Sequence, residues 1–128
     1  MKKAVIMLAL LMALAAALTG CGQTEAVYGR DDMSISVKSG EKFTIKLEAN
    51  PTTGYDWSVS VSDEAVVSLE KSEYLPDEKV SGAVGAGGAR VLVFKANDAG
   101  AATIDLVYQR SWEPKEDDER LRYTVTVK

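Results

Sequence analysis

The feature that most constrains the fold is an alternation of apolar and polar residues with a period of two. Between Phe43 and Ala49 every second residue is apolar, and the residues between them are Thr44, Lys46 and Glu48. Successive side chains of a β-strand point to opposite faces, so this pattern predicts a strand with one buried face. The same pattern recurs at residues 55–61, 103–109 and 121–127.

Three further segments complete the predicted strands. Residues 33–37 and 65–69 alternate more weakly, whereas residues 89–96 are almost continuously apolar, as is typical of a central strand. Turn residues separate these segments, and the 128 residues of the chain suggest one domain. We therefore predict an all-β fold, an immunoglobulin-like antiparallel β-sandwich of about seven strands.

The start of the chain has the pattern of an export signal. Two lysines precede an apolar run from Ala4 to Leu18, which is shorter than the about 20 residues of a transmembrane helix. The ending Leu18-Thr19-Gly20-Cys21 resembles the bacterial lipoprotein box, in which the cysteine is lipidated and becomes the N-terminus. The alternative is an ordinary signal peptide that contains a cysteine. We predict three regions: a lipoprotein signal peptide at 1–20, lipidated Cys21 with a tether at 21–32, and a folded domain at 33–128.

The single cysteine and the charge limit the partners. With Cys21 lipidated, the exported chain would have neither a free thiol nor a disulfide, and lipid would anchor it at the bacterial cell envelope. Loss of Lys2 and Lys3 with the leader leaves 13 basic and 19 acidic residues, a net charge of −6. Because an acidic domain without a basic stripe binds nucleic acid poorly, we expect no nucleic-acid partner.

Histidine is absent from the chain, so the commonest general base and zinc ligand is missing. Ser-His-Asp and Cys-His catalysis are excluded. We expect no metal site. The acidic residues 116–119 could form a calcium-binding loop as an alternative, although they lack the spacing of an EF-hand. We expect a monomeric binding protein without a cofactor, and not an enzyme.

The first unusual loop is Asn50-Pro51-Thr52-Thr53-Gly54, followed by Tyr55. Pro51 fixes its own φ and favours an extended Asn50, and Gly54 permits a φ that other residues avoid. We expect Thr52 and Thr53 on a stiff, uncharged tip that loses little entropy on binding. The alternative is a connecting turn in which Asn50 bonds its own backbone.

The second loop, Gly85-Ala86-Gly87-Gly88, precedes a strand and not a helix, which argues against a phosphate cradle. Its backbone groups could pair with an extended partner chain, or the loop could be a flexible hairpin. The third loop is Arg110-Ser111-Trp112. Trp and Arg are frequent in interface hot spots, but Trp112 could instead cap the core with Arg110 packed on its ring.

These three loops should lie together. They follow the second strand, precede the strand at 89–96 and follow the strand at 103–109. Alternate connections of an immunoglobulin-like sandwich gather at one end, so we expect all three at one pole.

The three motifs, in this order, resemble those of the chagasin-type inhibitors of papain-like cysteine peptidases, protease inhibitor family I42. The family pattern is Asn-Pro-x-Thr-Gly, Gly-x-Gly-Gly and Arg-Pro-Trp, and the resemblance covers roughly residues 33–128. One position departs from the pattern, because Ser111 stands where the family has Pro.

The resemblance implies that the chain inhibits papain-like cysteine peptidases reversibly and without a covalent bond. The tip at Thr52 and Thr53 would enter the active-site cleft, with Thr52 nearest the catalytic cysteine. The Gly85–Gly88 backbone would pair on one side, and Trp112, oriented by Arg110, would pack on the other. The alternative function is a non-enzymatic immunoglobulin-like adhesion or ligand-binding module of the cell envelope.

Overall fold

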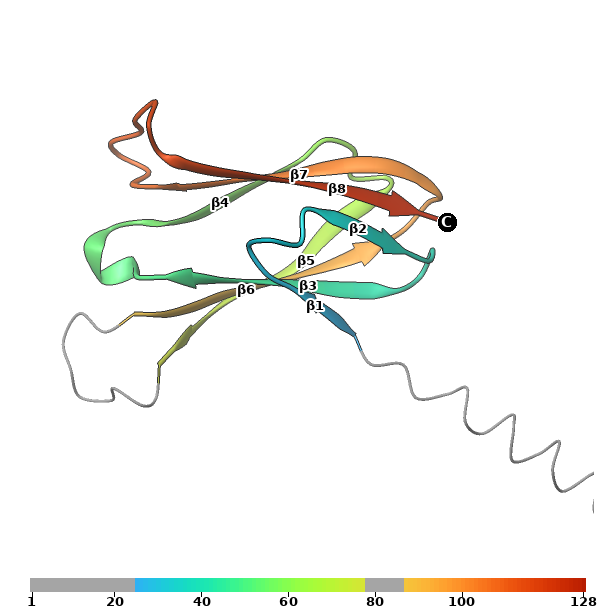
Figure 1. The fold of residues 1–128 in the computed structure, drawn as a ribbon, viewed down its shortest axis with the longest axis horizontal. Coiled ribbons are helices and arrows are strands. Elements are labelled where there is room, and N and C mark those ends of the chain that lie inside the picture. The colour runs from blue at the N-terminus through green and yellow to red at the C-terminus, as the bar shows by residue number, and fades with distance from the viewer. Residues whose placement is uncertain (1–24, 78–86) are drawn as a thin grey trace, which may run out of the picture.

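The computed structural model describes residues 25–77 and 87–128, which form two facing β-sheets (Figure 1). One sheet has the strand order β1-β3-β6-β5, and the other has the order β2-β8-β7-β4. The strands are β1 (Ala26–Tyr28), β2 (Ser34–Val37), β3 (Lys42–Ala49), β4 (Asp56–Val61), β5 (Val67–Pro76), β6 (Gly88–Ala96), β7 (Gly100–Gln109) and β8 (Glu119–Val127). The predicted all-β sandwich is confirmed.

The N-terminal part of the domain differs from the prediction. Ala26–Tyr28, which we assigned to the tether, forms β1 and brings the described strands to eight. Strand β1 pairs with β3 and strand β2 pairs with β8, both in parallel, whereas the other pairs are antiparallel. A three-residue strand added to a sheet edge has too few residues to show a period, and alternation does not encode the direction of the partner.

Strand β5 is longer than predicted. The alternation suggested residues 65–69, but the strand runs from Val67 to Pro76 along β6, with a bulge between Leu69 and Lys71. Most of its side chains are exposed, and β5 is one of the two edge strands of its sheet. A strand with little burial on either face carries no apolar period, so its second half was not recognisable in the sequence.

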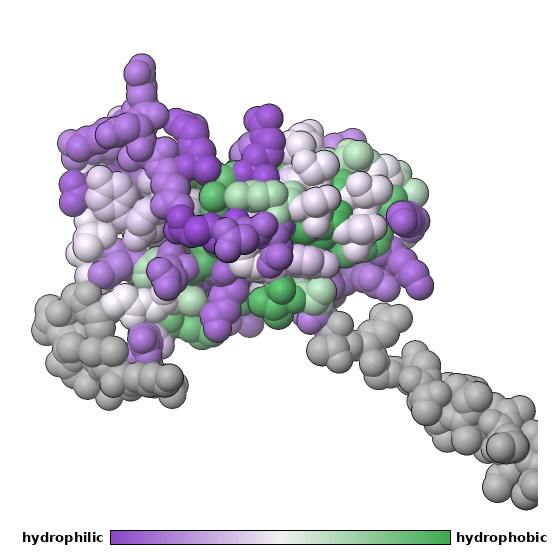
Figure 2. All heavy atoms as spheres, in the orientation of Figure 1, coloured by the Kyte–Doolittle hydropathy of each residue, from purple (hydrophilic) through white to green (hydrophobic). Residues whose placement is uncertain are grey.

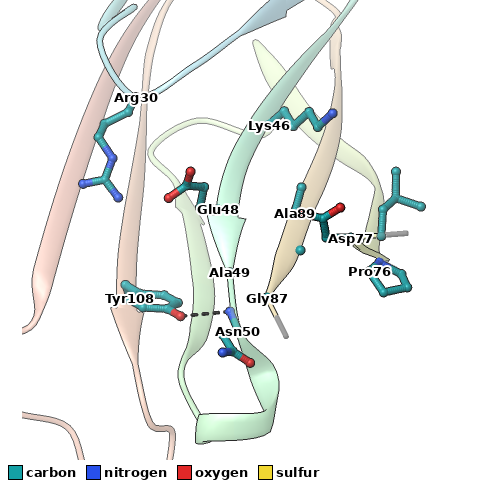
Figure 3. Close-up of a pocket in the computed structure, with 12 residues that line it drawn as sticks. Arg30, Lys46, Glu48, Ala49, Asn50, Pro76, Asp77, Gly87, Ala89 and Tyr108 are labelled. Carbon is teal, nitrogen blue, oxygen red and sulfur yellow. Dashed lines mark hydrogen bonds between the residues drawn. The ribbon is translucent and has the colours of Figure 1, made fainter. Parts of the chain in front are cut away.

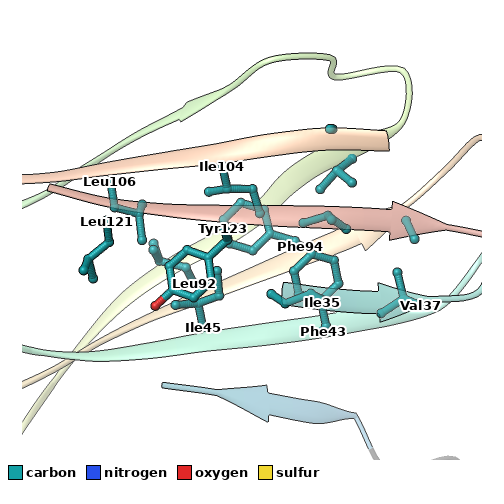
Figure 4. Close-up of a cluster of buried hydrophobic side chains, with 14 of the residues drawn as sticks. Ile35, Val37, Phe43, Ile45, Leu92, Phe94, Ile104, Leu106, Leu121 and Tyr123 are labelled. Atoms are coloured by element: carbon teal, nitrogen blue, oxygen red, sulfur yellow. The ribbon is translucent and has the colours of Figure 1, made fainter. Parts of the chain in front are cut away.

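The core lies between the two sheets. Alternate residues of β3 and β8 point inward, and the rings of Phe43 and Phe94 stack with their centroids 5.4 Å apart (Figure 4). All buried hydrophobic residues of the described chain lie between Ile35 and Val127. Before Ile35, the partly buried Tyr28 packs against this core, with its ring edge-on to Phe43 at a centroid distance of 6.2 Å.

The surface in view is mixed in character. Hydrophilic side chains gather over the β7–β8 loop at one end of the molecule, and more hydrophobic residues show along the other half (Figure 2). Across residues 25–77 and 87–128, no helix has the length and apolar character needed to cross a membrane.

Candidate functional site

Three connections begin and end at one end of the sandwich, away from the C-terminus (Figure 1). They join β3 to β4, β5 to β6 and β7 to β8, and they contain the three motifs. Of the Gly-rich motif, Gly87 and Gly88 are described, whereas Gly85 and Ala86 lie outside the described residues. The expected convergence on one pole is thus confirmed for the described parts of all three loops.

The β3–β4 loop is a compact 3₁₀ turn over Pro51–Thr53. The amide N–H of Thr53 donates to the Asn50 carbonyl at 3.1 Å, and that of Gly54 donates to the Pro51 carbonyl at 2.9 Å. The Thr53 hydroxyl also donates to the Asn50 carbonyl, at 2.7 Å. Thr52 and Thr53 are exposed. The tip is therefore held by its own hydrogen bonds and faces solvent, as predicted.

Aromatic residues hold the two ends of this loop. The Asn50 N–H donates to the Tyr108 hydroxyl oxygen at 3.0 Å (Figure 3), and the Trp57 indole N–H donates to the Glu48 carbonyl at 2.9 Å. The Tyr108 ring contacts the rings of both Tyr55 and Trp57, at centroid distances of 5.5 Å and 4.9 Å. The role of Tyr108 was missed in the sequence, where it appeared only as an apolar position of a strand.

Arg110 braces the tip from the neighbouring loop. Its Nε donates to the Thr53 carbonyl at 3.1 Å, and its guanidinium lies 4.6 Å from the centroid of the Tyr55 ring. Its Nη1 also lies 3.7 Å from a carboxylate oxygen of Glu113. Arg110 therefore packs on Tyr55, and the alternative in which it packs on the Trp112 ring is wrong.

Trp112 is an exposed residue of the pole, with 70% of its surface accessible. The alternative in which it caps the core is therefore wrong. Its six-membered ring covers Gly54 so closely that a Cβ built on Gly54 would lie 2.5 Å from the Trp112 Cη2. Gly54 also has φ of +86°, a conformation that favours glycine. The first and third loops thus meet at this glycine.

The turn of the third loop is closed despite the missing proline. Glu113 donates its N–H to the Arg110 carbonyl at 3.0 Å, and the two residues form an isolated antiparallel bridge. This bridge encloses Ser111 and Trp112, so backbone pairing replaces the restriction that a proline would supply.

The two described glycines of the second motif have different surroundings. A Cβ on Gly88 would lie 2.2 Å from the Leu75 carbonyl oxygen and 2.8 Å from the Pro76 Cα, so the sheet itself requires glycine there. A Cβ on Gly87 would meet only ordinary contacts, 3.6 Å from the Ala49 carbonyl oxygen. Gly87 is therefore the described glycine whose missing side chain can serve a partner.

A groove of about 780 Å³ opens beside this pole (Figure 3). Gly87 and Asn50 both line it, together with Leu75 and Tyr108. Backbone at the start of β6 can thus be approached from this side.

A family model, "Chagasin family peptidase inhibitor I42", matches residues 36–127. The chain belongs to this family. The resemblance inferred from the three motifs is thereby confirmed. This family consists of peptidase inhibitors and not of enzymes. The expectation that the chain is not an enzyme is therefore also confirmed.

Known relatives agree with this assignment over most of their length. The chain is 33% identical to Amoebiasin-1 of Entamoeba histolytica over 97 residues, or 76% of this chain and 92% of that protein. It is 33% identical to Chagasin of Trypanosoma cruzi over 101 residues, or 74% of this chain and 87% of that protein. The crystal structure of the cysteine protease inhibitor EhICP2 from Entamoeba histolytica matches 84% of this chain and 100% of that chain, with a TM-score of 0.70 and 27% identity.

Two acidic residues that follow the third loop are engaged in contacts within the domain. Asp118 accepts the Lys115 N–H at 2.7 Å, and Glu119 pairs with Arg30. In the described part of the chain, no three His, Cys, Asp or Glu side chains come close enough together to hold a metal ion.

Proposed function

We propose that the chain is a reversible, non-covalent inhibitor of papain-like cysteine peptidases that occludes the active-site cleft with three clustered loops. The observation that carries this proposal is the junction of the loops at one pole. The exposed Thr52–Thr53 tip, the exposed Trp112 ring and the Gly87 backbone lie there, and Arg110 ties two of the loops together. Membership of a peptidase-inhibitor family supports the same function.

The tip suits a plug better than a substrate. Its backbone carbonyls at Asn50, Pro51 and Thr53 are already hydrogen-bonded within the domain. Cleavage requires a peptide to distort toward the transition state, and a tip held in this way resists that distortion. The tip is also preorganised, which lowers the entropy lost on binding. Insertion into a cleft with Trp112 on one side and Gly87 on the other would bury about 1,600 Å² in total, if the interface is of standard size.

A titration of papain with the soluble chain from Gly22 onward tests the proposed function. We expect stoichiometric loss of peptidase activity at or below micromolar concentration, competitive with a peptide substrate and reversible on dilution. Full activity at micromolar inhibitor would overturn the proposal and favour the adhesion module, which has no reason to affect papain.

We also propose that Cys21 is lipidated and anchors the exported protein at the bacterial cell envelope. The support is the leader pattern that ends at Leu18-Thr19-Gly20-Cys21. The direction of β1 fits such an anchor, because Ala26 pairs with Phe43 at the start of β3 and the loop tip follows the end of β3. An anchor before Ala26 would therefore leave the three loops facing away from the membrane.

Labelling of cells with a clickable fatty acid tests the anchor. The full chain should incorporate the label and partition with membranes, and a Cys21→Ser chain should do neither. Equal labelling of both chains, or none of either, would contradict lipidation at Cys21.

A further inference from the structure

The two ends of the Asn50–Tyr55 loop belong to different sheets. Strand β3, which ends at Ala49, lies in one sheet, and strand β4, which begins at Asp56, lies in the other. The shape of the loop therefore depends on how the two sheets are held relative to each other at this pole. A tie between the sheets at the base of the loop would fix the tip.

An ion pair provides such a tie. Arg90 of β6 donates from Nε to Asp56 Oδ1 at 3.0 Å, and its Nη2 donates to Asp56 Oδ2. The contact is bidentate and joins the β1-β3-β6-β5 sheet to the first residue of β4 in the other sheet. Paired parallel hydrogen bonds between guanidinium and carboxylate fix orientation as well as distance.

The pair is shielded and supported on both sides. The Arg90 side chain is 17% exposed and the Asp56 side chain 32%. The Arg90 guanidinium lies 5.8 Å from the centroid of the Tyr74 ring, and Asp56 Oδ1 also accepts the Trp57 N–H at 2.8 Å. Arg90 pairs in register with Leu47, and Leu92 two positions later is fully buried, so Arg90 extends from the core-facing side of β6. Partial burial makes this pair less screened by water than the exposed ion pairs elsewhere in the domain.

We infer that Arg90 and Asp56 form a positioning ion pair for the inhibitory loop. Together they hold the β4 end of the Asn50–Tyr55 loop against the opposite sheet and keep the Thr52–Thr53 tip in its binding shape. They act through the loop, and neither residue belongs to the three motifs. The expected effect of this ion pair on inhibition rests on the proposed function. The expected effect of the pair on the shape of the loop does not depend on that function.

The domain offers a matched control. Arg122 of β8 and Asp105 of β7 form a similar pair, with Nε donating to Oδ1 at 2.6 Å and Nη2 to Oδ2 at 3.4 Å. Both strands belong to one sheet, and the Arg122 side chain is 70% exposed. Loss of this pair removes an arginine–carboxylate contact but no contact between the two sheets.

The test compares Arg90→Met, Asp56→Asn, the double variant and the control Arg122→Met. Papain inhibition and amide hydrogen exchange of the free proteins are measured.

We expect each single variant to weaken inhibition about tenfold, the loss associated with a charge-assisted contact. The double variant should inhibit papain as well as the poorer inhibitor of the two single variants, because the two residues act as a unit. Exchange at the Thr53 and Gly54 amides should rise in all three and stay unchanged in Arg122→Met.

Unchanged inhibition and exchange in the single variants, or additive losses in the double variant, would overturn the inference. So would a rise in Thr53 and Gly54 exchange that merely matches a rise throughout the core. If Arg90→Met does not fold, Asp56→Asn decides, since it keeps the side-chain shape and removes only the charge. If the unaltered chain fails to inhibit papain, the proposed function fails, and the exchange measurement alone still decides the role of the pair.

Discussion

Gly54 and Trp112 come from separate motifs, yet they form one contact. The Trp112 ring occupies the space that a side chain on Gly54 would need, and Gly54 has the positive φ that closes the 3₁₀ turn. Gly54 thus closes the turn of the tip and also leaves the space in which the Trp112 indole packs. The value of either residue to binding depends on the other.

Substitution of Gly54 should uncouple the two loops. In Gly54→Ala we expect about 1 kcal/mol of lost stability from the positive φ and, in addition, displacement of Trp112 and weaker papain inhibition. Gly40→Ala is the control, because Gly40 has φ of +91° but a Cβ added there would meet no atom within 4 Å. Thermal unfolding and inhibition constants separate the effects. Equal inhibition by both variants would argue against a functional Gly54–Trp112 contact.

Trp112 should contribute to binding far more than to folding. Because it is 70% exposed, we expect Trp112→Ala to change the free energy of unfolding by no more than about 0.5 kcal/mol. Inhibition of papain should weaken by about 2 kcal/mol or more, as for other hot-spot residues. An unchanged inhibition constant would remove Trp112 from the interface.

At the scale of elements, the start of β6 serves both the sheet and the partner. Strand β6 has β3 on one side and β5 on the other, and Gly88 pairs with Ala49 and Pro76. The sequence motif presents Gly87 and Gly88 as equivalent. The close approach of the β5 backbone to Gly88 alone makes them different.

Substitution of Gly88 should therefore affect stability, whereas substitution of Gly87 should affect inhibition. Gly88→Ala should destabilise the fold by at least about 2 kcal/mol, because its Cβ would overlap β5 backbone atoms that cannot rotate away. Gly87→Ala should fold normally and weaken inhibition by hindering approach to the backbone. Urea unfolding and papain titration of both variants check this. A stable Gly88→Ala protein would show that β5 can move away.

Strand β8 is linked to the segment after β1 by Tyr123. The fully buried Tyr123 donates its hydroxyl hydrogen to the Gly29 carbonyl at 2.8 Å. Burial, followed by the negative charge of Asp32, raises the pKa of Tyr123 above its usual value. The folded state therefore holds this proton more tightly than the unfolded chain does.

This raised pKa predicts a loss of stability at alkaline pH. The contribution of Tyr123 is complete below about pH 10, its unfolded pKa, and is lost as the pH rises toward the higher folded pKa. Tyr123→Phe should lose about 1 kcal/mol at neutral pH with the hydrogen bond. Its free energy of unfolding should then fall less steeply than that of the unaltered chain above about pH 10. Parallel pH profiles would contradict this role of Tyr123.

At the scale of the whole molecule, the sandwich separates its two ends. The three loops extend from one pole, and the described chain begins with β1, whose residues pair with the first half of β3 (Figure 1). The proposed peptidase-binding loops and the proposed lipid anchor would therefore lie at opposite ends of the domain.

Strand alternation was enough to predict the sandwich, and loop order was enough to predict the shared pole. The contacts that fix the loops to the rest of the domain could not be predicted, because they join residues far apart in the chain. Tyr108 meets Asn50 across 58 positions, and Arg90 meets Asp56 across 34. None of these contacts leaves a local pattern. β1 was missed for a related reason, since its pairing with β3 and not its own sequence makes it a strand.

The central claim is that the three loops bind one partner together, and amide hydrogen exchange in the complex with papain tests it most directly. We expect papain to protect amides of all three loops, at Thr52–Tyr55, Gly87–Gly88 and Ser111–Trp112. The turns at the opposite pole, at 38–41 and 97–100, should exchange as in the free protein. Protection of one loop alone, or of the opposite pole, would contradict the claim.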